Sequence, residues 1–343
     1  MKGFVSKLIL TILILFFSTI SMASSKSLTF AIVPKYYSVF FDESGKGCKE
    51  AAAKFESVEC IYRGPHKGDV RLQNAIIEQL IIEKVDGIAI AVTQSDFLAR
   101  NSIQKAITAG IPIVTYDSDF DIATQKKYPN IRSAYIGTNN FQFGRALGEQ
   151  LKKLRPDGGT LIIQTGRPDS PNLNLRIMGL RTALSGKVYS TPPGELLDNH
   201  SGWTEVREPL LNYDQISRSV KQLESFLKAK KSQADSFIAV GGWPQNDDDN
   251  YRQMISPYKY KLDNKEVVLI ISDTSDIQLR MLRDNLAHVN VGQSPYDMGV
   301  QSLLTLHNIV NNENHNKIIY TPLTFCTANN YERCTHNIRG NLD

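Results

Sequence analysis

The sequence is poor in the residue types that most often bind metals or redox cofactors. Its 343 residues include only four cysteines and six histidines. The cysteines show no CxxC spacing, and His200, His307 and His315 show no spacing typical of metal ligands. The acidic stretch QNDDDN at 245–250 lacks the glycine and glutamate of a calcium-binding loop, so the solvated start of a helix is the better interpretation. We therefore expect no metal and no cofactor.

The motifs of common enzymes and of nucleic-acid-binding proteins are missing as well. There is no G-x-S-x-G, no H-E-x-x-H and no glycine-rich phosphate loop, which argues against a hydrolase and predicts a protein that is not an enzyme. The formal net charge is +4, and the charged residues are scattered. Because no basic cluster exists, we expect no nucleic-acid partner.

Long apolar runs are absent from the sequence except at its start. There Lys2 and Lys7 precede an apolar run from Leu8 to Ile20, which is followed by small residues up to Ala23. This pattern is typical of a secretory signal peptide, here residues 1–23. An uncleaved membrane anchor is the alternative, but the run falls short of the roughly 20 residues that span a bilayer. We expect a soluble protein that is exported to the periplasm.

The rest of the chain alternates between strand-like and helix-like segments. At about 320 residues it is too long for one ordinary core, so we expect two domains. Strands are expected at 28–33, 86–92, 111–116, 133–138, 159–165, 236–242, 266–272 and 288–293. Helices are expected at 42–56, 70–84, 97–109, 140–154, 215–230, 275–285 and 295–311. The alternation predicts an α/β fold with parallel sheets that carry helices on both faces.

One segment without a clear pattern and four cysteines remain to be placed. Residues 191–213 form the longest irregular segment, and a loop of that length is normally functional or an insertion. In an exported chain the four cysteines can form two disulfides, in three possible connectivities. We favour Cys48 with Cys60 and Cys326 with Cys334, because each pair closes a short loop.

The stretch IPIVTYDSDF at 111–120 places two acids, Asp117 and Asp119, just past an apolar strand. The carboxyl ends of parallel strands are where open α/β sheets bind ligands. Three interpretations compete: a catalytic acid/base pair, a metal site, and hydrogen-bond acceptors for a hydroxyl-rich molecule. Two carboxylates this close on one strand end cannot flank a glycosidic bond from opposite sides.

Other strand ends carry aromatic, acidic and cationic residues. Tyr36, Tyr37, Phe40 and Phe41 follow the first strand, while Arg176, Asp273 and Gln293 follow later strands. Aromatic rings pack on the apolar faces of sugars, and charged groups make strong hydrogen bonds to hydroxyls. Singly, each residue has another interpretation: the aromatics can fill a core, and Asp273 can start a helix. As a set, they favour a sugar site.

Four segments of the sequence resemble the periplasmic sugar-binding proteins of ABC transporters, of the ribose/galactose-binding type. They are YYSVFFDESGKGCKEAAAKF after the first strand, AGIPIVTYDSD, RIMGLRTAL and VGQSPYDMGVQSLL. The resemblance runs from about residue 27 to residue 324. It implies two doubly wound parallel-sheet lobes, joined by a three-strand hinge, with the ligand in the cleft between them.

The resemblance also implies a lobe division and a set of ligand-binding residues. The first lobe is expected at 27–138 and 294–323, and the second at 139–293 and 324–343, with crossings near 138, 293 and 323. Phe40 and Phe41 are expected to pack on the sugar ring, and Tyr213 to stack from the second lobe, with Trp203 and Trp243 as alternatives. The expected hydrogen-bonding residues are Asp117, Arg176, Asp273 and Gln293.

The sequence departs from the ribose binders at several of these positions. Ser118 stands where ribose binders have an arginine, and Ser38, Ala91 and Gly241 stand at family asparagines. The resemblance therefore implies a ligand other than ribose itself.

The resemblance leaves two partners open for a monomeric protein. One is an ABC permease that receives the sugar. The alternative is a membrane sensor kinase or chemoreceptor that reads a sugar or a sugar-like autoinducer.

Overall fold

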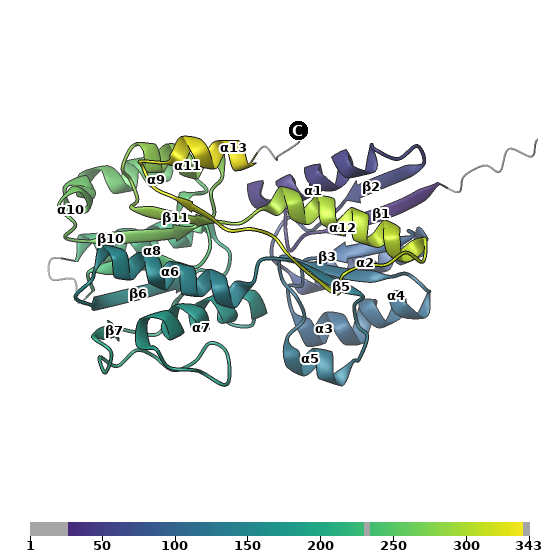
Figure 1. Ribbon diagram of the computed structural model, residues 1–343, viewed down its shortest axis with the longest axis horizontal. Helices are drawn as coiled ribbons and strands as arrows, with labels where there is room; N and C mark the ends of the chain where they lie inside the picture. Colours follow the sequence, from purple (N-terminus) through teal and green to yellow (C-terminus); the bar gives the residue numbers. More distant parts are fainter. Residues whose placement is uncertain (1–26, 230–233, 339–343) are drawn as a thin grey trace, which may run out of the picture.

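The polypeptide forms two lobes, each built on one sheet with helices on both faces (Figure 1). The computed structural model describes residues 27–229 and 234–338. The predicted signal peptide lies outside these residues. Within them, no helix combines the length and the apolar character needed to cross a membrane.

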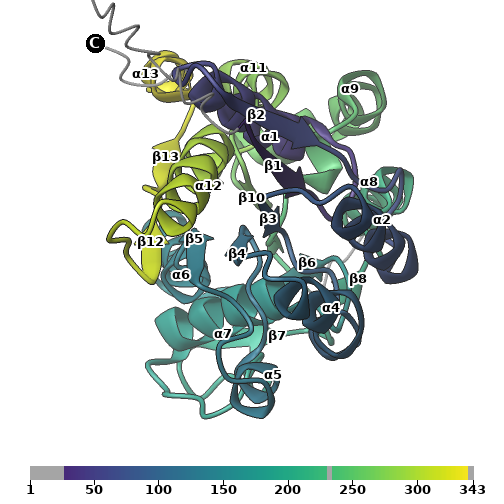
Figure 2. The ribbon, with the colours of Figure 1, turned by 90° about the vertical axis from the view of Figure 1, so that its right-hand side faces the viewer.

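The first lobe contains a six-stranded, fully parallel sheet in the order β12-β5-β4-β3-β1-β2. Its strands are β1 (Leu28–Val33), β2 (Val58–Tyr62), β3 (Gly87–Ile90), β4 (Ile113–Tyr116), β5 (Ala134–Gly137) and β12 (Ile318–Tyr320). Helices α1 (Val39–Ala52) and α12 (Pro295–Val310) cover one face, and α2 (Val70–Ile82), α3 (Ser95–Leu98) and α4 (Gln104–Thr108) cover the other (Figure 2). A π-helical turn at Ala99–Ile103 joins α3 to α4, and α5 (Ile122–Lys127) follows β4.

The second lobe contains a sheet in the order β13-β11-β10-β9-β6-β7, with β8 also paired to β6. Its strands are β6 (Gly159–Thr165), β7 (Trp203–Glu205), β8 (Leu210–Leu211), β9 (Ser236–Ala239), β10 (Val268–Ser272), β11 (Val289–Gly292) and β13 (Thr324–Cys326). Helices α6 (Asn140–Leu154) and α7 (Pro171–Ser185) pack on one face, and α8 (Ile216–Lys228), α9 (Asp248–Ile255) and α11 (Asp276–Arg283) pack on the other. Helices α10 (Lys259–Asp263) and α13 (Tyr331–Ile338) complete the lobe, with single 3-10 turns at Trp243–Gln245 and Ser256–Tyr258.

Three connections join the lobes, as Figure 1 shows. They run from β5 to α6, from β11 to α12 and from β12 to β13. The hydroxyl of Thr138 in the first connection donates to Oε1 of Gln293 in the second, at 2.9 Å. The predicted α/β fold with two parallel-sheet lobes and a three-strand hinge is confirmed. One strand differs: β13 runs antiparallel to β11 at the edge of the second sheet.

Each of the eight expected strands contains a strand of the structure, whereas five short ones were not predicted. The unpredicted strands are β2, β7, β8, β12 and β13, which have two to five residues. Four of these five lie at a sheet edge, where a long apolar run is not required because only one side is paired. Helix α1 starts three residues earlier than expected, because Ser38 caps it through the backbone N–H of Phe41.

The segment 191–213 is partly built into the second sheet. Its residues 203–205 and 210–211 form β7 and β8, and Trp203 is buried in the core under α6 and α7. Glu205 forms a buried, bidentate ion pair with Arg181 of α7, with N–O distances of 2.6 and 2.7 Å. The same guanidinium donates to the carbonyl of Gly194. The segment is therefore fixed to α7 by buried charges rather than left as an open loop.

Two disulfides reinforce the outer parts of the lobes. Cys48–Cys60 joins α1 to β2, and Cys326–Cys334 joins β13 to α13. Both are the local pairs favoured from the sequence. Each ties a short edge strand to the helix that follows or precedes it.

Candidate ligand-binding cleft

A cavity lies between the lobes, where the carboxyl ends of both sheets face each other. Its volume is about 60 Å³. This is far below the roughly 300 Å³ at which ligand pockets begin, so the cavity does not hold a drug-sized ligand with the lobes in this arrangement. The lining residues are Lys35, Tyr36, Ser38, Phe40, Phe41, Asp117, Asn172, Leu173, Arg176, Asp214, Gly241, Gly242, Trp243, Asn246, Asp273 and Gln293. Six of the seven ligand-binding residues predicted from the sequence are among them.

Asp117 and Asp273 hold equivalent places in the two lobes. Asp117 follows β4, and its N–H donates to the carbonyl of Ile136 in β5; Asp273 follows β10, and its N–H donates to Val291 in β11. Both residues adopt a left-handed backbone, with φ of 56° and 72°. This conformation is uncommon outside glycine, asparagine and aspartate. It turns the chain at the strand end, where each carboxylate reaches the cavity.

Lys35 connects the two lobes across the cavity. It is the second residue after the end of β1, and its Nζ lies 3.6 Å from Oδ2 of Asp117. The same ammonium donates to Oδ1 of Asn172 at 3.0 Å and contacts the hydroxyl of Ser170 at 3.4 Å, both in the second lobe. Burial lowers the pKa of Lys35, and the nearby Asp117 and Asp214 carboxylates oppose this shift.

Arg176 is positioned by the close packing of α6 and α7. A Cβ atom at Gly144 of α6 would overlap the backbone oxygen of Arg176, so glycine is needed for this approach. The guanidinium donates to Oδ1 of Asn140 at 2.8 Å, to the carbonyl of Val240 at 2.8 Å and to Oε1 of Gln293 at 2.7 Å. These three bonds fix its plane while leaving two of its five N–H groups for a ligand.

Gln293 joins Arg176 to Asp273. Its Nε2 donates to Oδ1 of Asp273 at 2.8 Å, and the N–H of Gly242 donates to the other carboxylate oxygen at 3.1 Å. Burial raises the pKa of the Asp273 carboxyl, while Arg176 and these hydrogen bonds act in the opposite direction. Because Gln293 lies in a connection between the lobes, the hinge and the site share one hydrogen-bond network.

Aromatic side chains enclose the cavity from both lobes. Phe40 and Phe41 meet edge to face, with ring centroids 5.1 Å apart, and Phe41 also packs against Tyr36. The indole Nε1 of Trp243, in the second lobe, donates to the hydroxyl of Tyr36 at 3.2 Å. Phe41 is 4% exposed, so it belongs both to the core under α1 and to the cavity wall.

Asp119, the second acid of this stretch, is held by an ion pair outside the cavity. Asp119 forms a bidentate ion pair with Arg132, at 2.6 and 2.7 Å, and accepts the hydroxyl of Thr115 at 2.7 Å. It does not line the cavity. Asp119 is therefore engaged by Arg132 outside the cavity that Asp117 lines, and the two acids do not converge on one site.

Tyr213 is the predicted site residue that the structure does not bring to the cavity. It is 41% exposed, and its ring packs under the guanidinium of Arg218 at 5.0 Å. Tyr213 and Asp214 both have a positive φ, and it is Asp214 that faces the cavity. The structure therefore does not bring Tyr213 to this cavity, and its stacking role stays a prediction. Of its alternatives, Trp243 lines the cavity and Trp203 is buried in the core.

The sequence alone did not identify Lys35, Asn172, Asp214 or Asn246 as lining residues. Two of them carry a signal in the sequence. Lys35 comes almost directly after a strand end, and Asn172 precedes Arg176 by one helical turn, which places both on the same face of α7. Asp214 and Asn246 follow short or irregular segments, where no periodicity of the sequence indicates which way a side chain points.

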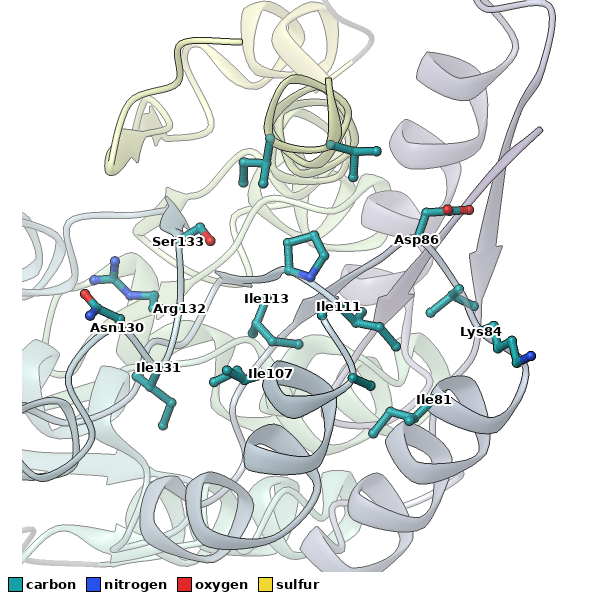
Figure 3. A pocket seen from close by; sticks show the side chains of 16 residues that line it. Ile81, Lys84, Asp86, Ile107, Ile111, Ile113, Asn130, Ile131, Arg132 and Ser133 are labelled. Carbon is teal, nitrogen blue, oxygen red and sulfur yellow. The ribbon is translucent and has the colours of Figure 1, made fainter. Parts of the chain in front are cut away.

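A larger hollow lies at the opposite, amino-terminal end of the first sheet (Figure 3). Its volume is about 820 Å³, and its lining mixes apolar side chains, among them Ile81, Ile107 and Ile111, with polar ones such as Asn130 and Arg132. Arg132 at its rim is already paired with Asp119. Within residues 27–229 and 234–338, no group of three or more His, Cys, Asp and Glu side chains could hold a metal ion. The interlobe cavity remains the place where polar groups from several elements converge.

Comparison with known proteins agrees with this geometry. The chain is 32% identical over 151 residues to a D-ribose/D-allose-binding protein of Pseudomonas aeruginosa, which is 43% of this chain and 46% of that protein. The chain thus spans about half the length of this curated relative.

Among solved structures, an ABC transporter solute-binding protein of Burkholderia graminis, in complex with D-arabinose, superposes with a TM-score of 0.76 at 28% identity. That match covers 90% of this chain and 98% of the other. A solute-binding protein of Bacillus halodurans with bound myo-inositol has a TM-score of 0.75 over 92% and 99% of the chains, and its 19% identity supports the fold alone.

A family model described as a periplasmic binding protein domain matches residues 30–314. This range includes every strand of both sheets apart from the edge strands β12 and β13 and the first two residues of β1. It also includes every residue that lines the interlobe cavity. The chain therefore belongs to the periplasmic binding protein domain family.

Proposed function

We propose that the protein captures a small sugar or sugar-like ligand in the interlobe cleft and delivers it to an ABC permease. The observation that carries this proposal is the convergence of Asp117, Arg176, Asp273 and Gln293, from both lobes, on one cavity with aromatic walls. Charged acceptors and donors of this kind make strong hydrogen bonds to hydroxyls, and the rings pack on the apolar faces of a sugar. The relatives with sugars in their descriptions support the same ligand class.

Residues 1–23 fit this role as a signal peptide that directs a monomeric protein to the periplasm. The site needs no chemical step: the ligand binds, the lobes close and the complex docks on its membrane partner. We keep a sugar other than D-ribose as the expected ligand, because buried Ser118 offers no guanidinium at this strand end.

A receptor that reports to a membrane sensor is the other role open to this fold. A long exposed loop for a dedicated partner would favour that role, and residues 191–213 are the longest irregular stretch of the sequence. Its second half is packed into the lobe as β7 and β8, and Glu205 is held by Arg181. We therefore place transport first.

The test starts from protein exported with its own leader and purified from the periplasm. Mass spectrometry identifies the small molecule that co-purifies, and calorimetry measures the affinity of that molecule and of a panel of pentoses and hexoses. We expect at least one sugar to bind, to be recovered chemically unchanged and to reduce the radius of gyration in small-angle scattering. Failure of every sugar to bind, or its conversion to another compound, would contradict the proposal.

A further inference from the structure

The cavity between the lobes is lined by more acidic than cationic side chains. Lys35 and Arg176 are cationic, whereas Asp117, Asp214 and Asp273 are acidic. Two of the acids have a cationic counterpart: Lys35 lies 3.6 Å from Asp117, and Gln293 links Arg176 to Asp273 through bonds of 2.7 and 2.8 Å. Asp214 is the acid that is left over.

The carboxylate of Asp214 has no hydrogen bond or ion pair with any residue in the described part of the chain. Its backbone N–H donates to Oδ1 of Asn212, and the residue lines the cavity. The nearby cation Arg167 is engaged by Asp169, at 3.1 Å. Burial raises the pKa of the Asp214 carboxyl, and Lys35 and Arg167 oppose this only from a distance.

Two glycines lie against the carboxylate of Asp214. A Cβ atom at Gly68, in a loop of the first lobe, would lie 3.2 Å from its Oδ2. A Cβ atom at Gly166, after β6, would lie 2.7 Å from its Oδ1. Asp214 therefore comes close to the first lobe, at the side of the cleft where closure brings the two lobes together.

We propose that Asp214 is a ligand-contacting residue that sets the charge selectivity of the cleft. It admits sugars that present a hydroxyl or an ammonium group to it, and it excludes sugars that present a carboxylate or a phosphate. This inference rests on the proposed sugar-binding function and adds the class of sugar that the site accepts.

The physical reason is the cost of an unpaired like charge in a closed, poorly solvated site. A hydroxyl or ammonium group donates to Asp214 and satisfies its lone pairs. An anionic group would meet a cleft whose acids already outnumber its cations, and both positive side chains have protein partners. A like charge within a few ångströms in such a site weakens binding by about tenfold or more.

The experiment compares matched ligands that differ in one group. Calorimetry at pH 7 measures D-glucose, D-glucosamine, D-glucuronate and D-glucose 6-phosphate, and then D-galactose with its three corresponding derivatives. In each series that binds, the neutral sugar or the amine should bind at least about tenfold more tightly than the acid and the phosphate. Asp214→Asn should reduce this discrimination by about tenfold, because it removes the negative charge. Asparagine is the appropriate substitution, since it keeps the left-handed backbone and the volume of the side chain.

Asp157→Asn is the control, because it removes a negative charge of the same lobe at an exposed position that does not line the cavity. It should leave the discrimination unchanged, and thermal melting verifies that both variants fold. An acid or phosphate that binds as tightly as its neutral parent overturns the inference while sugar binding stands. Unaltered discrimination in Asp214→Asn overturns the assignment to Asp214. If neither these ligands nor any sugar of the pentose and hexose panel binds, the proposed function itself fails.

Discussion

Replacing Asp117 and Asp119 separately by asparagine should affect two different properties of the protein. Asp117 is 4% exposed and lines the cavity, so the Asp117→Asn variant loses charge-assisted hydrogen bonds to the ligand. Truncating one partner of such a buried charged interaction costs about 2–5 kcal/mol, which is a loss of affinity from about 30-fold to several thousand-fold. Asparagine is the appropriate substitution because it tolerates the left-handed backbone at φ 56°, whereas alanine would add strain.

Asp119→Asn should leave affinity unchanged and reduce stability. The variant weakens a bidentate pair with Arg132, whose side chain is 14% exposed, and the hydrogen bond from Thr115. Losing these charge-assisted bonds costs about 1–3 kcal/mol of unfolding free energy. In Asp117→Asn the Lys35 ammonium keeps Asn172 and Ser170 as acceptors, so that fold should persist.

The assay pairs calorimetry, with the sugar that the panel identifies, and urea denaturation of the ligand-free protein. The expected result is that Asp117→Asn loses ligand affinity and keeps its stability, whereas Asp119→Asn loses stability and keeps its affinity. Wild-type affinity in Asp117→Asn, or an equal loss of affinity in both variants, would refute the assignment of Asp117 as a ligand acceptor.

Three further predictions concern stability. Glu205→Gln should lower the unfolding free energy by about 3–5 kcal/mol, because it leaves the buried guanidinium of Arg181 uncompensated, and calorimetry should show unchanged ligand affinity. Replacing Cys326 and Cys334 by serine should cost about 2–4 kcal/mol in urea denaturation, whereas a change in affinity instead of stability would be unexpected. Burial lowers the pKa of His288 below its usual 6.5, so its contribution is complete above pH 6.5 and is lost as the pH falls. Unfolding free energy should therefore decrease from pH 6.5 to 5, by at most about 1.4 kcal/mol per pH unit for this one proton, and His288→Gln should flatten that slope.

The parts of the fold that were predictable are those set by local sequence. Central strands of a parallel sheet are buried on both faces, so β1 and β6 read as apolar runs and were predicted to the residue. Edge strands such as β12 and β13 have three residues each and include exposed side chains. They form because a neighbouring strand offers free backbone groups, which no local pattern reveals.

The candidate site divides in the same way. Asp117, Arg176, Asp273 and Gln293 could be named from the sequence because each follows a strand or lies at a matching position in a family segment. No sequence pattern indicated that Asp214 would line the cavity and its neighbour Tyr213 would not, because both lie in an irregular turn with a positive φ.

The sequence by itself determined the alternation of strands and helices, the family resemblance and the kinds of side chain at the strand ends, because these depend on residues near one another in the chain. The tertiary structure alone decided which side chains meet. Lys35 reaches Asn172, 137 positions away, and Trp243 reaches Tyr36 across 207 positions. Such contacts depend on how two separately folded lobes pack and close, and that geometry is a property of the whole chain.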